Sequence, residues 1–428
     1  MSLRHPFLRC VAWSLVTALL AGCASTKVPP IGAGRPFQLE ADERRIWTDA
    51  EKEEAKLEKS GKVYDDPLLE EYLGRIGDRL VGSEVKEAGV GLRFTVFRDP
   101  SLNAFAMPNG RVYVHTGLLA RIENEAQLAT VLGHELTHVT NRDALRFQRD
   151  ATNKKIAYTV AAIALSIGVA VAAGKQAEHG NVVGAAVLSQ TANAILGLGL
   201  QLAALAAING YGRDIERQAD EEGLARMVKA GYDPTQAPRV YQLLKKDGGD
   251  PSRLENFFFG NHPRLDERIE TTSALLASRY AAQAQAPDRI VDTPEFNLRI
   301  RTVVRENAAL DIRAGRFNLA KAQLDRVLAI IPRDPVAHLY YGDLYRIQSQ
   351  RAKALADKES LVRRAIDEYT EAARLDPAYP DPFRQLGFLY YQQEERDRSR
   401  EAFQTYLRLK PDAPDARRIK EYLLELDR

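Results

Sequence analysis

The chain has 428 residues, a formal net charge of +2 and only two cysteines. The small net charge argues against a protein that binds nucleic acid, and the cysteine count excludes a small fold held together by several disulfides. The length is enough for two hydrophobic cores, so we expect two domains.

Residues 1–22 have the features of a bacterial export signal. A short basic stretch precedes the apolar run 11–20, which is too short to span a bilayer. The small residues before Cys23 resemble the lipobox of bacterial lipoproteins. That resemblance implies a lipidated Cys23 and, with Ala24 after it, anchoring to the outer membrane on the periplasmic side. An ordinary cleaved signal peptide is the alternative. Residues 23–40 are predicted to be a tether.

Helices are predicted over about residues 40–58 and 66–82. A strand at 92–97 follows, in which apolar and polar residues alternate. A second strand at 111–115 follows a Pro-Asn-Gly turn. The edge of such a small sheet could bind an extended polypeptide through its backbone, with little dependence on sequence.

A His-Glu-x-x-His motif occupies residues 134–138. On a helix, His134 and His138 lie on one face and can bind the same metal ion, whereas Glu135 is placed to act on a water held by that metal. Two histidines leave a zinc ion short of ligands, so a third ligand must come from elsewhere. The alternative is a polar helix face, but apolar residues at helical spacing flank the motif: Leu128, Val131, Leu132, Leu136 and Val139.

An acidic cluster later in the chain offers the third ligand. Glu216 and Asp220 are four residues apart and share a helix face. A carboxylate ligand would leave the site with a net charge of +1, which favours Glu216 as the ligand. Asp220 would then accept a hydrogen bond from a ligand histidine. An ordinary charged helix surface is the alternative.

Two low-charge stretches, 156–174 and 182–210, separate the two clusters and are long enough to span a membrane. Because Ala and Gly dominate them, we favour a helical hairpin that packs on the domain or dips into the membrane surface over true membrane spans. Further helices are expected at 236–247 and 264–278.

From about Val303 onward, helix-forming residues with spaced aromatics are typical of tetratricopeptide repeats. One unit contains Phe383, Leu386, Gly387, Tyr390, Ser399, Phe403, Tyr406 and Pro411, and an earlier unit contains Tyr341, Gly342, Tyr345, Ala365, Tyr369, Ala372 and Pro377. Their glycines are 45 residues apart (387 − 342) rather than about 34, so the earlier unit carries an insertion near 348–360. A protein-binding surface is favoured over a purely structural array.

Four motifs occur in the order found in the M48 family of zinc metallopeptidases, which the chain resembles from about Glu43 to Ala277. They are Asn103–Gly110, the His-Glu-x-x-His motif, Arg213–Asp220 and Asn261–Pro263. The resemblance implies that His134, His138 and Glu216 bind one zinc ion and that Glu135 is the general base. It also implies a substrate cleft bordered by Asn103, Ala104, Phe105 and Ala106.

The resemblance gives His262 a regulatory role, because in periplasmic members of the family a histidine in this loop can bind the zinc as a fourth ligand and hold the enzyme inactive. A turn histidine without a catalytic role is the alternative. The residue that stabilises the oxyanion stays open between Tyr211, Arg213 and His262.

The predicted fold is mostly α-helical: a zincin-like metalloprotease domain (41–285) with a small β-sheet at the cleft, a linker (286–302) and an α-solenoid of repeats (303–428). This combination resembles that of the β-barrel assembly-enhancing proteases within the family. It implies a periplasmic zinc endopeptidase that degrades misfolded or stalled envelope proteins, with the outer-membrane assembly machinery as partner and no nucleic acid. The lipobox, in which this chain departs from those proteases, adds a lipid anchor to the prediction. A chaperone or scaffold with secondary proteolysis is the alternative, and a peptidoglycan or lipid hydrolase is weakly supported.

Overall fold

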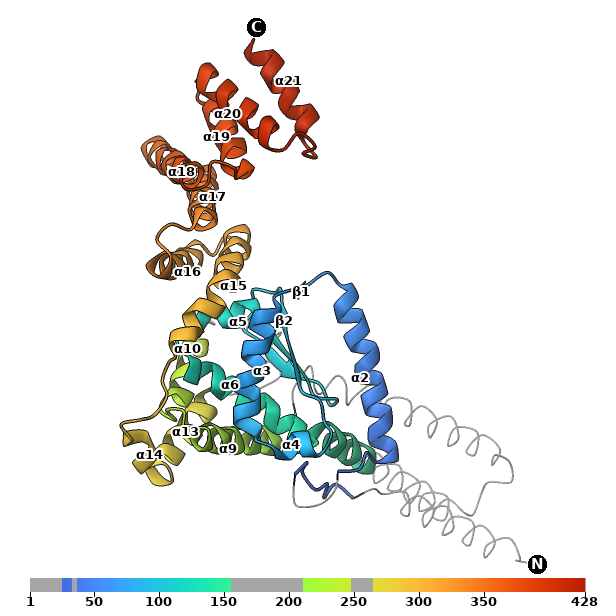
Figure 1. The fold of residues 1–428 in the computed structure, drawn as a ribbon. Coiled ribbons are helices and arrows are strands. Elements are labelled where there is room, and N and C mark those ends of the chain that lie inside the picture. Colours follow the sequence, from blue (N-terminus) through green and yellow to red (C-terminus); the bar gives the residue numbers. More distant parts are fainter. Residues whose placement is uncertain (1–24, 33–36, 155–210, 248–264, 428) are drawn as a thin grey trace, which may run out of the picture. The chain divides into compact units, whose positions relative to one another are not determined.

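A computed structural model describes residues 25–32, 37–154, 211–247 and 265–427 (Figure 1). These residues fall into two compact units. The first contains the described residues up to Phe97 together with 102–114 and 122–292, and the second contains 98–101, 115–121 and everything from Thr293 onward. Both units are mainly helical and the first contains a small sheet, so the predicted fold class is confirmed.

The sheet has four strands in the order β1-β2-β4-β3. They are β1 (Val63–Tyr64), β2 (Arg93–Phe97), β3 (Ala104–Ala106) and β4 (Arg111–His115). The predicted strands correspond to β2 and β4 to within one residue. β1 was not predicted, because two residues are too few to show an alternating pattern.

Strand β3 forms one edge of this sheet. It pairs antiparallel with β4, with Phe105 opposite Tyr113 and Ala106 opposite Val112. The N–H of Met107 donates to the carbonyl of Arg111 at 2.6 Å, so these two residues form a hydrogen-bonded pair. Hydrogen-bonded and non-hydrogen-bonded pairs alternate along an antiparallel ladder. The backbone groups of Ala106, one residue earlier, therefore point away from β4. The side chain of Phe105 stacks on Tyr113 with ring centroids 5.0 Å apart.

Helices surround the sheet (Figure 1). Those of the first unit are α2 (Ala41–Lys59), α3 (Pro67–Val81), α4 (Glu84–Glu87), α6 (Glu125–Thr140), α9 (Arg213–Lys229), α10 (Gln236–Asp247), α13 (Leu265–Ser278) and α14 (Ala281–Gln285). The helices α2, α3, α10 and α13 match the predicted ranges to within one residue. Helix α3 packs against β2, where Gly77 leaves room for the ring of Phe94.

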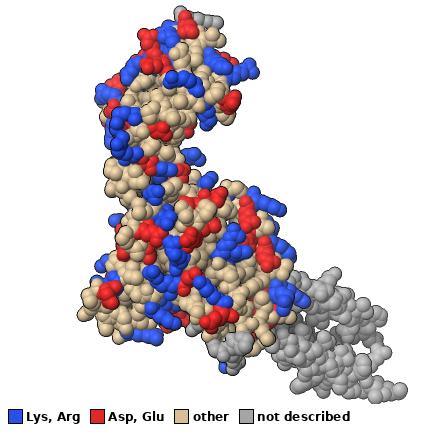
Figure 2. Space-filling model, viewed as in Figure 1, with Lys and Arg blue, Asp and Glu red and all other residues tan. Residues whose placement is uncertain are grey.

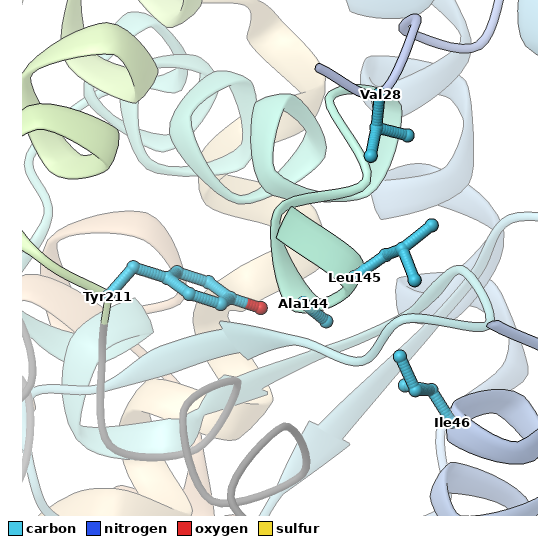
Figure 3. Packing of buried hydrophobic residues seen from close by; sticks show 5 residues of the cluster. All are labelled: Val28, Ile46, Ala144, Leu145 and Tyr211. Atoms are coloured by element: carbon cyan, nitrogen blue, oxygen red, sulfur yellow. The ribbon is translucent and has the colours of Figure 1, made fainter. Parts of the chain in front are cut away.

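The N-terminal segment of the first unit is docked on the fold. Val28 packs in a buried cluster with Ile46 of α2, the adjacent Ala144 and Leu145, and Tyr211 (Figure 3). Ala144 and Leu145 follow α6 in the chain. Through this cluster they pack against Ile46 of α2 and against Val28.

Polar contacts hold the same segment in place. The N–H of Ile31 donates to the carbonyl of Thr140 at 2.7 Å, and the Arg149 guanidinium donates to the carbonyl of Ser25 at 3.1 Å. Arg149 also pairs with Asp42 of α2 at 2.8 Å. Residues 25–32, which lie in the predicted tether, are therefore packed against the first unit.

The second unit consists of α5 (Thr116–Arg121), α15 (Pro294–Arg313), α16 (Phe317–Ile330), α17 (Pro335–Arg351), α18 (Leu355–Leu375), α19 (Pro380–Gln392), α20 (Arg396–Leu409) and α21 (Ala416–Leu426). The segment predicted as a linker, 286–302, includes the start of α15. Gly342 faces the ring of Tyr369 and Gly387 faces that of Phe403, so a Cβ on either glycine would clash. The predicted glycines are thus the points of close contact within two helix pairs.

Helix α5 joins the repeats through buried polar contacts. The hydroxyl of Thr116 donates to the Asn307 side chain at 2.9 Å, and Arg121 pairs with Asp311 at 3.1 Å. Asp311 is fully buried and also pairs with Arg316, so Arg121 helps to neutralise a buried charge where α5 meets α15. The sequence alone placed residues 116–121 in the protease domain, but the contacts group them with the repeat unit.

Within the described residues, no helix is long and apolar enough to cross a membrane. The stretches 156–174 and 182–210, the signal 1–22, Cys23 and His262 lie outside the described residues. On the face shown in Figure 2, basic and acidic side chains are intermixed, as expected for a net charge of only +2.

Candidate metal centre

The His-Glu-x-x-His motif lies on α6, which is buried along its whole length. Asn124 caps the helix by accepting a hydrogen bond from the N–H of Gln127 at 3.0 Å, and Glu125 in the first turn suits the helix dipole. The four-residue spacing places the imidazoles of His134 and His138 on one face. Their Nε2 atoms are 3.2 Å apart.

The acidic cluster lies on α9, which packs directly against α6. This contact brings the Glu216 carboxylate to the two imidazoles. Its Oε2 atom is 3.3 Å from Nε2 of His134, and its Oε1 atom is 3.7 Å from Nε2 of His138. All three residues are buried, and among the described residues they form the one cluster with metal-ligand geometry.

These separations fit a bound zinc ion. Two ligands about 2.0–2.1 Å from a tetrahedral zinc ion lie about 3.3 Å apart, which matches the distances between these atoms. The donor set of two neutral imidazoles and one carboxylate is one that catalytic zinc sites use. The residues therefore fit the metal, with a fourth position for water or substrate.

Each ligand histidine has a carboxylate partner on its other ring nitrogen. Nδ1 of His134 is 2.9 Å from Asp220, and Nδ1 of His138 is 2.9 Å from Asp143. Such partners fix the tautomer, so that Nε2 faces the metal, and they increase the basicity of the ligand.

An arginine from α13 completes the surroundings of His134. The Arg268 guanidinium forms hydrogen bonds with both oxygens of Asp220, and it stacks over the ring of Tyr241 with its Cζ atom 4.2 Å from the ring centroid. The Tyr241 hydroxyl donates to Asp220 at 3.0 Å. Arg268 therefore fixes Asp220, which in turn orients His134.

The surroundings of His134 favour its protonated form when no metal is bound. Burial and the Arg268 guanidinium oppose the charged form of His134, but hydrogen bonds to Asp220 and Glu216 outweigh them and raise its pKa to about 9. Burial acts to raise the pKa of Asp220, but Arg268 and His134 prevail and lower it to about 2. A metal ion must displace the His134 proton, because only the neutral imidazole is a ligand.

Metal affinity should therefore rise with pH. Below a pKa of about 9, losing one proton on binding changes the apparent affinity about tenfold per pH unit, which gives about a hundredfold loss from about pH 8 to about pH 6. Competition with a chromogenic chelator, corrected for the chelator's own protonation, measures this. A His338→Gln variant, which removes a histidine paired with Glu368 in the other unit, should show the same slope. A flat profile would show that His134 is neutral before the metal binds.

The side chain of Glu135 extends from α6 to the edge strand β3. Its Oε2 atom accepts a hydrogen bond from the N–H of Ala106 in β3 at 3.0 Å. Ala104, Phe105 and Ala106 are buried beside it, and the buried side-chain amide of Asn103 has no hydrogen-bond partner among the described residues. The predicted base and the predicted cleft segment are thus adjacent.

The three candidates for the oxyanion-stabilising group differ in position. The ring of Tyr211 lies against that of His138, with ring centroids 4.6 Å apart. The backbone N–H of Tyr211 donates to the Glu216 carboxylate at 3.1 Å. Burial raises the pKa of the Tyr211 hydroxyl well above its usual value, so this group stays a neutral donor. Arg213 is exposed at the start of α9, and His262 lies outside the described residues.

Two glycines allow α6 and α9 to approach closely. A Cβ built on Gly223 would lie 2.9 Å from the backbone nitrogen of His134, and one built on Gly133 would lie 3.0 Å from the Gly223 carbonyl oxygen. The distance from Glu216 to the histidines depends on this contact.

A Gly223→Ala substitution should push the two helices apart. We expect a loss of about 1–3 kcal/mol of unfolding free energy, as for an overpacked core, together with weaker metal binding. Gly74→Ala in α3 is the matched control, because nothing lies within 4 Å of its added methyl group. Denaturant unfolding and metal titration of both variants test this. Equal metal affinity in the two variants would contradict the expected role of the contact.

Sequence reasoning missed three residues around the metal site: Asp143, Tyr241 and Arg268. Arg268 left a detectable signal, since it shares the buried face of α13 with Leu265 and Thr272. An arginine at a core position of an amphipathic helix indicates a buried carboxylate partner. Asp143 and Tyr241 left no comparable signal, because only the tertiary contacts place them beside the site.

Comparison with known proteins agrees with this geometry. Residues 67–276 match the profile of Peptidase family M48. This part of the chain is an M48 peptidase domain. Residues 352–423 match a tetratricopeptide repeat profile. The predicted combination of an M48 domain with C-terminal repeats, and the prediction of a metallopeptidase, are confirmed at the level of these families.

The relatives with matching sequences include beta-barrel assembly-enhancing proteases and a mitochondrial metalloendopeptidase. The chain is 30% identical over 297 residues to the putative beta-barrel assembly-enhancing protease of Vibrio cholerae, covering 69% of this chain and 56% of that protein. It is 28% identical to the Escherichia coli beta-barrel assembly-enhancing protease, with 63% and 49% covered. It is 27% identical to the mitochondrial metalloendopeptidase OMA1 of Arabidopsis thaliana, with 54% and 41% covered. The chain spans about half the length of these relatives.

Proposed function

We propose that this protein is a zinc endopeptidase that cleaves unfolded envelope proteins during outer-membrane assembly. The observation that carries the proposal is the convergence of His134, His138 and Glu216 beside Glu135, next to the edge strand β3 of the sheet. The beta-barrel assembly-enhancing proteases among the relatives support the site of action.

His134, His138 and Glu216 would hold a zinc ion, which would supply Lewis-acid activation of water and of the scissile carbonyl. Glu135 accepts the proton of the attacking water and passes it to the leaving amine. The hydrogen bond from the N–H of Ala106 orients the Glu135 carboxylate for this transfer. Asp220 and Asp143 keep the histidine tautomers in place during the reaction.

Strand β3 is suited to bind the substrate. The backbone groups of Ala104 and the carbonyl group of Ala106 point away from β4, whereas the N–H of Ala106 donates to Glu135. An extended chain can therefore add to this edge by β-augmentation through the Ala104 groups and the Ala106 carbonyl. Backbone pairing depends little on side chains, which suits a protease that recognises unfolded segments of many sequences.

The test is hydrolysis by the purified chain of an unfolded protein, such as reduced and alkylated lactalbumin, and of the same protein in its folded form. We expect cleavage of the unfolded form only, loss of cleavage with a chelator, and recovery on adding stoichiometric zinc. Cleavage that persists after the metal is removed would refute the proposed function.

We further propose that a lipid on Cys23 anchors the protein to the outer membrane from the periplasmic side. Two described contacts near this position, from Arg149 to Ser25 and from Ile31 to Thr140, would hold the catalytic unit close to the anchor. A Cys23→Ser variant that carries an ordinary cleavable signal peptide in place of residues 1–22 should move from the membrane fraction to the soluble fraction of cells, as seen by fractionation and blotting. Retention of this variant in the outer-membrane fraction would contradict the anchor.

A role mainly as a scaffold for outer-membrane assembly is the second candidate, because residues 352–423 match a tetratricopeptide profile and such repeats bind proteins. The Glu135→Gln variant separates the two functions in cells that lack the wild-type chain. Full rescue of an envelope defect by this variant would favour the scaffold, and failure to rescue would favour proteolysis.

A further inference from the structure

The predicted insertion in the repeat unit builds a cavity beside the turn between α17 and α18. Helix α18 has 21 residues, whereas α16 and α20 have 14 each. The additional residues extend the two helices around 348–360 and provide most of the lining of a cavity of about 490 Å³. This volume lies in the range of ligand-binding pockets.

Two arginines that line this cavity have no carboxylate partner in the described part of the chain. Arg351 and Arg364 form no ion pair within the described residues, although other arginines of the same unit do. The paired arginines include those at positions 305, 316, 346, 374, 384, 398 and 400. A guanidinium that is left without an internal carboxylate, on the wall of a cavity, can form bidentate bonds with a carboxylate of a ligand.

Aromatic rings hold both guanidinium groups in position. The Cζ atom of Arg351 lies 5.1 Å from the ring centroid of Phe317, and that of Arg364 lies 3.9 Å from that of Tyr345. Arg364 also donates a hydrogen bond to the Tyr345 hydroxyl. Stacking reduces the conformational entropy that each side chain would lose on binding a ligand.

The charge around the cavity favours an acidic ligand. Residues 348–364 contain five basic and two acidic side chains, a net charge of +3 (5 − 2) in a chain whose total is +2. Apolar surface lies alongside, because Leu355 in the first turn of α18 is 70% exposed and Leu361 lines the cavity. A ligand that carries both carboxylates and an apolar side chain matches this surface.

The remaining lining residues favour a peptide over a phosphate polymer or a lipid headgroup. Asp357 and Gln348 offer hydrogen-bond acceptors, which a peptide N–H can satisfy and a phosphate cannot. We propose that this cavity binds an acidic segment of a partner protein, with an apolar residue of that segment packed against Leu355. The site uses the helix ends at the turn and depends on the inserted residues.

Binding can be measured by fluorescence anisotropy with the full chain in its Glu135→Gln form, so that the probe is not cleaved. The probe is a short fluorescent peptide of Asp and Glu with one central Leu. We expect saturable binding that weakens with added salt, and no binding of a peptide in which Lys replaces every acidic residue. Arg351→Gln and Arg364→Gln should each weaken binding about tenfold.

Arg374→Gln is the matched control, since Arg374 lies on the same helix and is already paired with Glu371. It should leave the affinity unchanged, whereas Leu355→Ser should lower it. Thermal unfolding followed by circular dichroism shows whether each variant is folded. If Arg364→Gln is unfolded, the exposed Arg351 decides the result. Equal affinity in Arg351→Gln and the unmutated protein would overturn the proposal, as would displacement of the peptide by phosphatidylglycerol vesicles.

Discussion

Glu135→Gln should abolish proteolysis while leaving the metal bound and the fold intact. The amide cannot accept the proton of the attacking water, and a general base contributes about 10²- to 10⁴-fold to such reactions. The glutamine keeps the size of the side chain and can still accept the hydrogen bond from the N–H of Ala106. Initial rates of cleavage of an unfolded protein, with zinc content measured by atomic absorption, test both expectations.

The matched control for this change is Glu125→Gln at the start of the same helix. Glu125 is buried and accepts hydrogen bonds from the hydroxyls of Tyr72 and Tyr232 at 2.6 and 2.7 Å. Losing the Glu125 carboxylate should reduce the stability of the protein. The variant molecules that remain folded should cleave substrate at nearly the wild-type rate. A Glu135→Gln variant that kept more than about a tenth of the wild-type cleavage rate would have lost less than about tenfold in rate. Glu135 would then not be the general base.

Glu216→Gln should remove the metal and the activity together. A neutral amide oxygen replaces the carboxylate that compensates the metal charge, and two imidazoles alone bind zinc weakly. We expect no stoichiometric zinc after dialysis at a metal concentration that saturates the wild type. Isothermal titration with zinc and the cleavage assay together measure the effect.

Asp220→Asn should weaken metal binding less than Glu216→Gln does, because Asp220 contacts His134 but does not reach the metal position. Loss of such a partner lowers metal affinity about 10- to 100-fold, so this variant should recover activity at high zinc concentration whereas Glu216→Gln should not. Full zinc occupancy in Glu216→Gln under the dialysis conditions would show that another residue is the third ligand.

Local patterns were enough to predict the helices and the elements of the candidate site. The spacing of His134 and His138 puts both imidazoles on one helix face, and periodicity predicted α2, α3, α10 and α13 to within one residue. The repeat positions were also readable, because Gly342 and Gly387 must be small wherever two helices of a repeat touch.

Contacts between residues far apart in the sequence could not be predicted from local patterns. The Arg268 contact with Asp220 and the close approach of Gly223 to His134 join residues that are far apart in the sequence and follow no local period. Helix α5 is a further case. It follows β4 directly in the chain but packs through Arg121 and Asp311 in the repeat unit.

The sequence by itself determined which side chains could bind a metal ion and which helices carry them, because a helical period is a property of neighbouring residues. The tertiary structure alone decided that Glu216 reaches His134, that buried carboxylates hold both imidazoles, and that Arg351 and Arg364 line one cavity. These facts depend on how whole helices pack, and packing is set by the fit of side chains far apart in the chain.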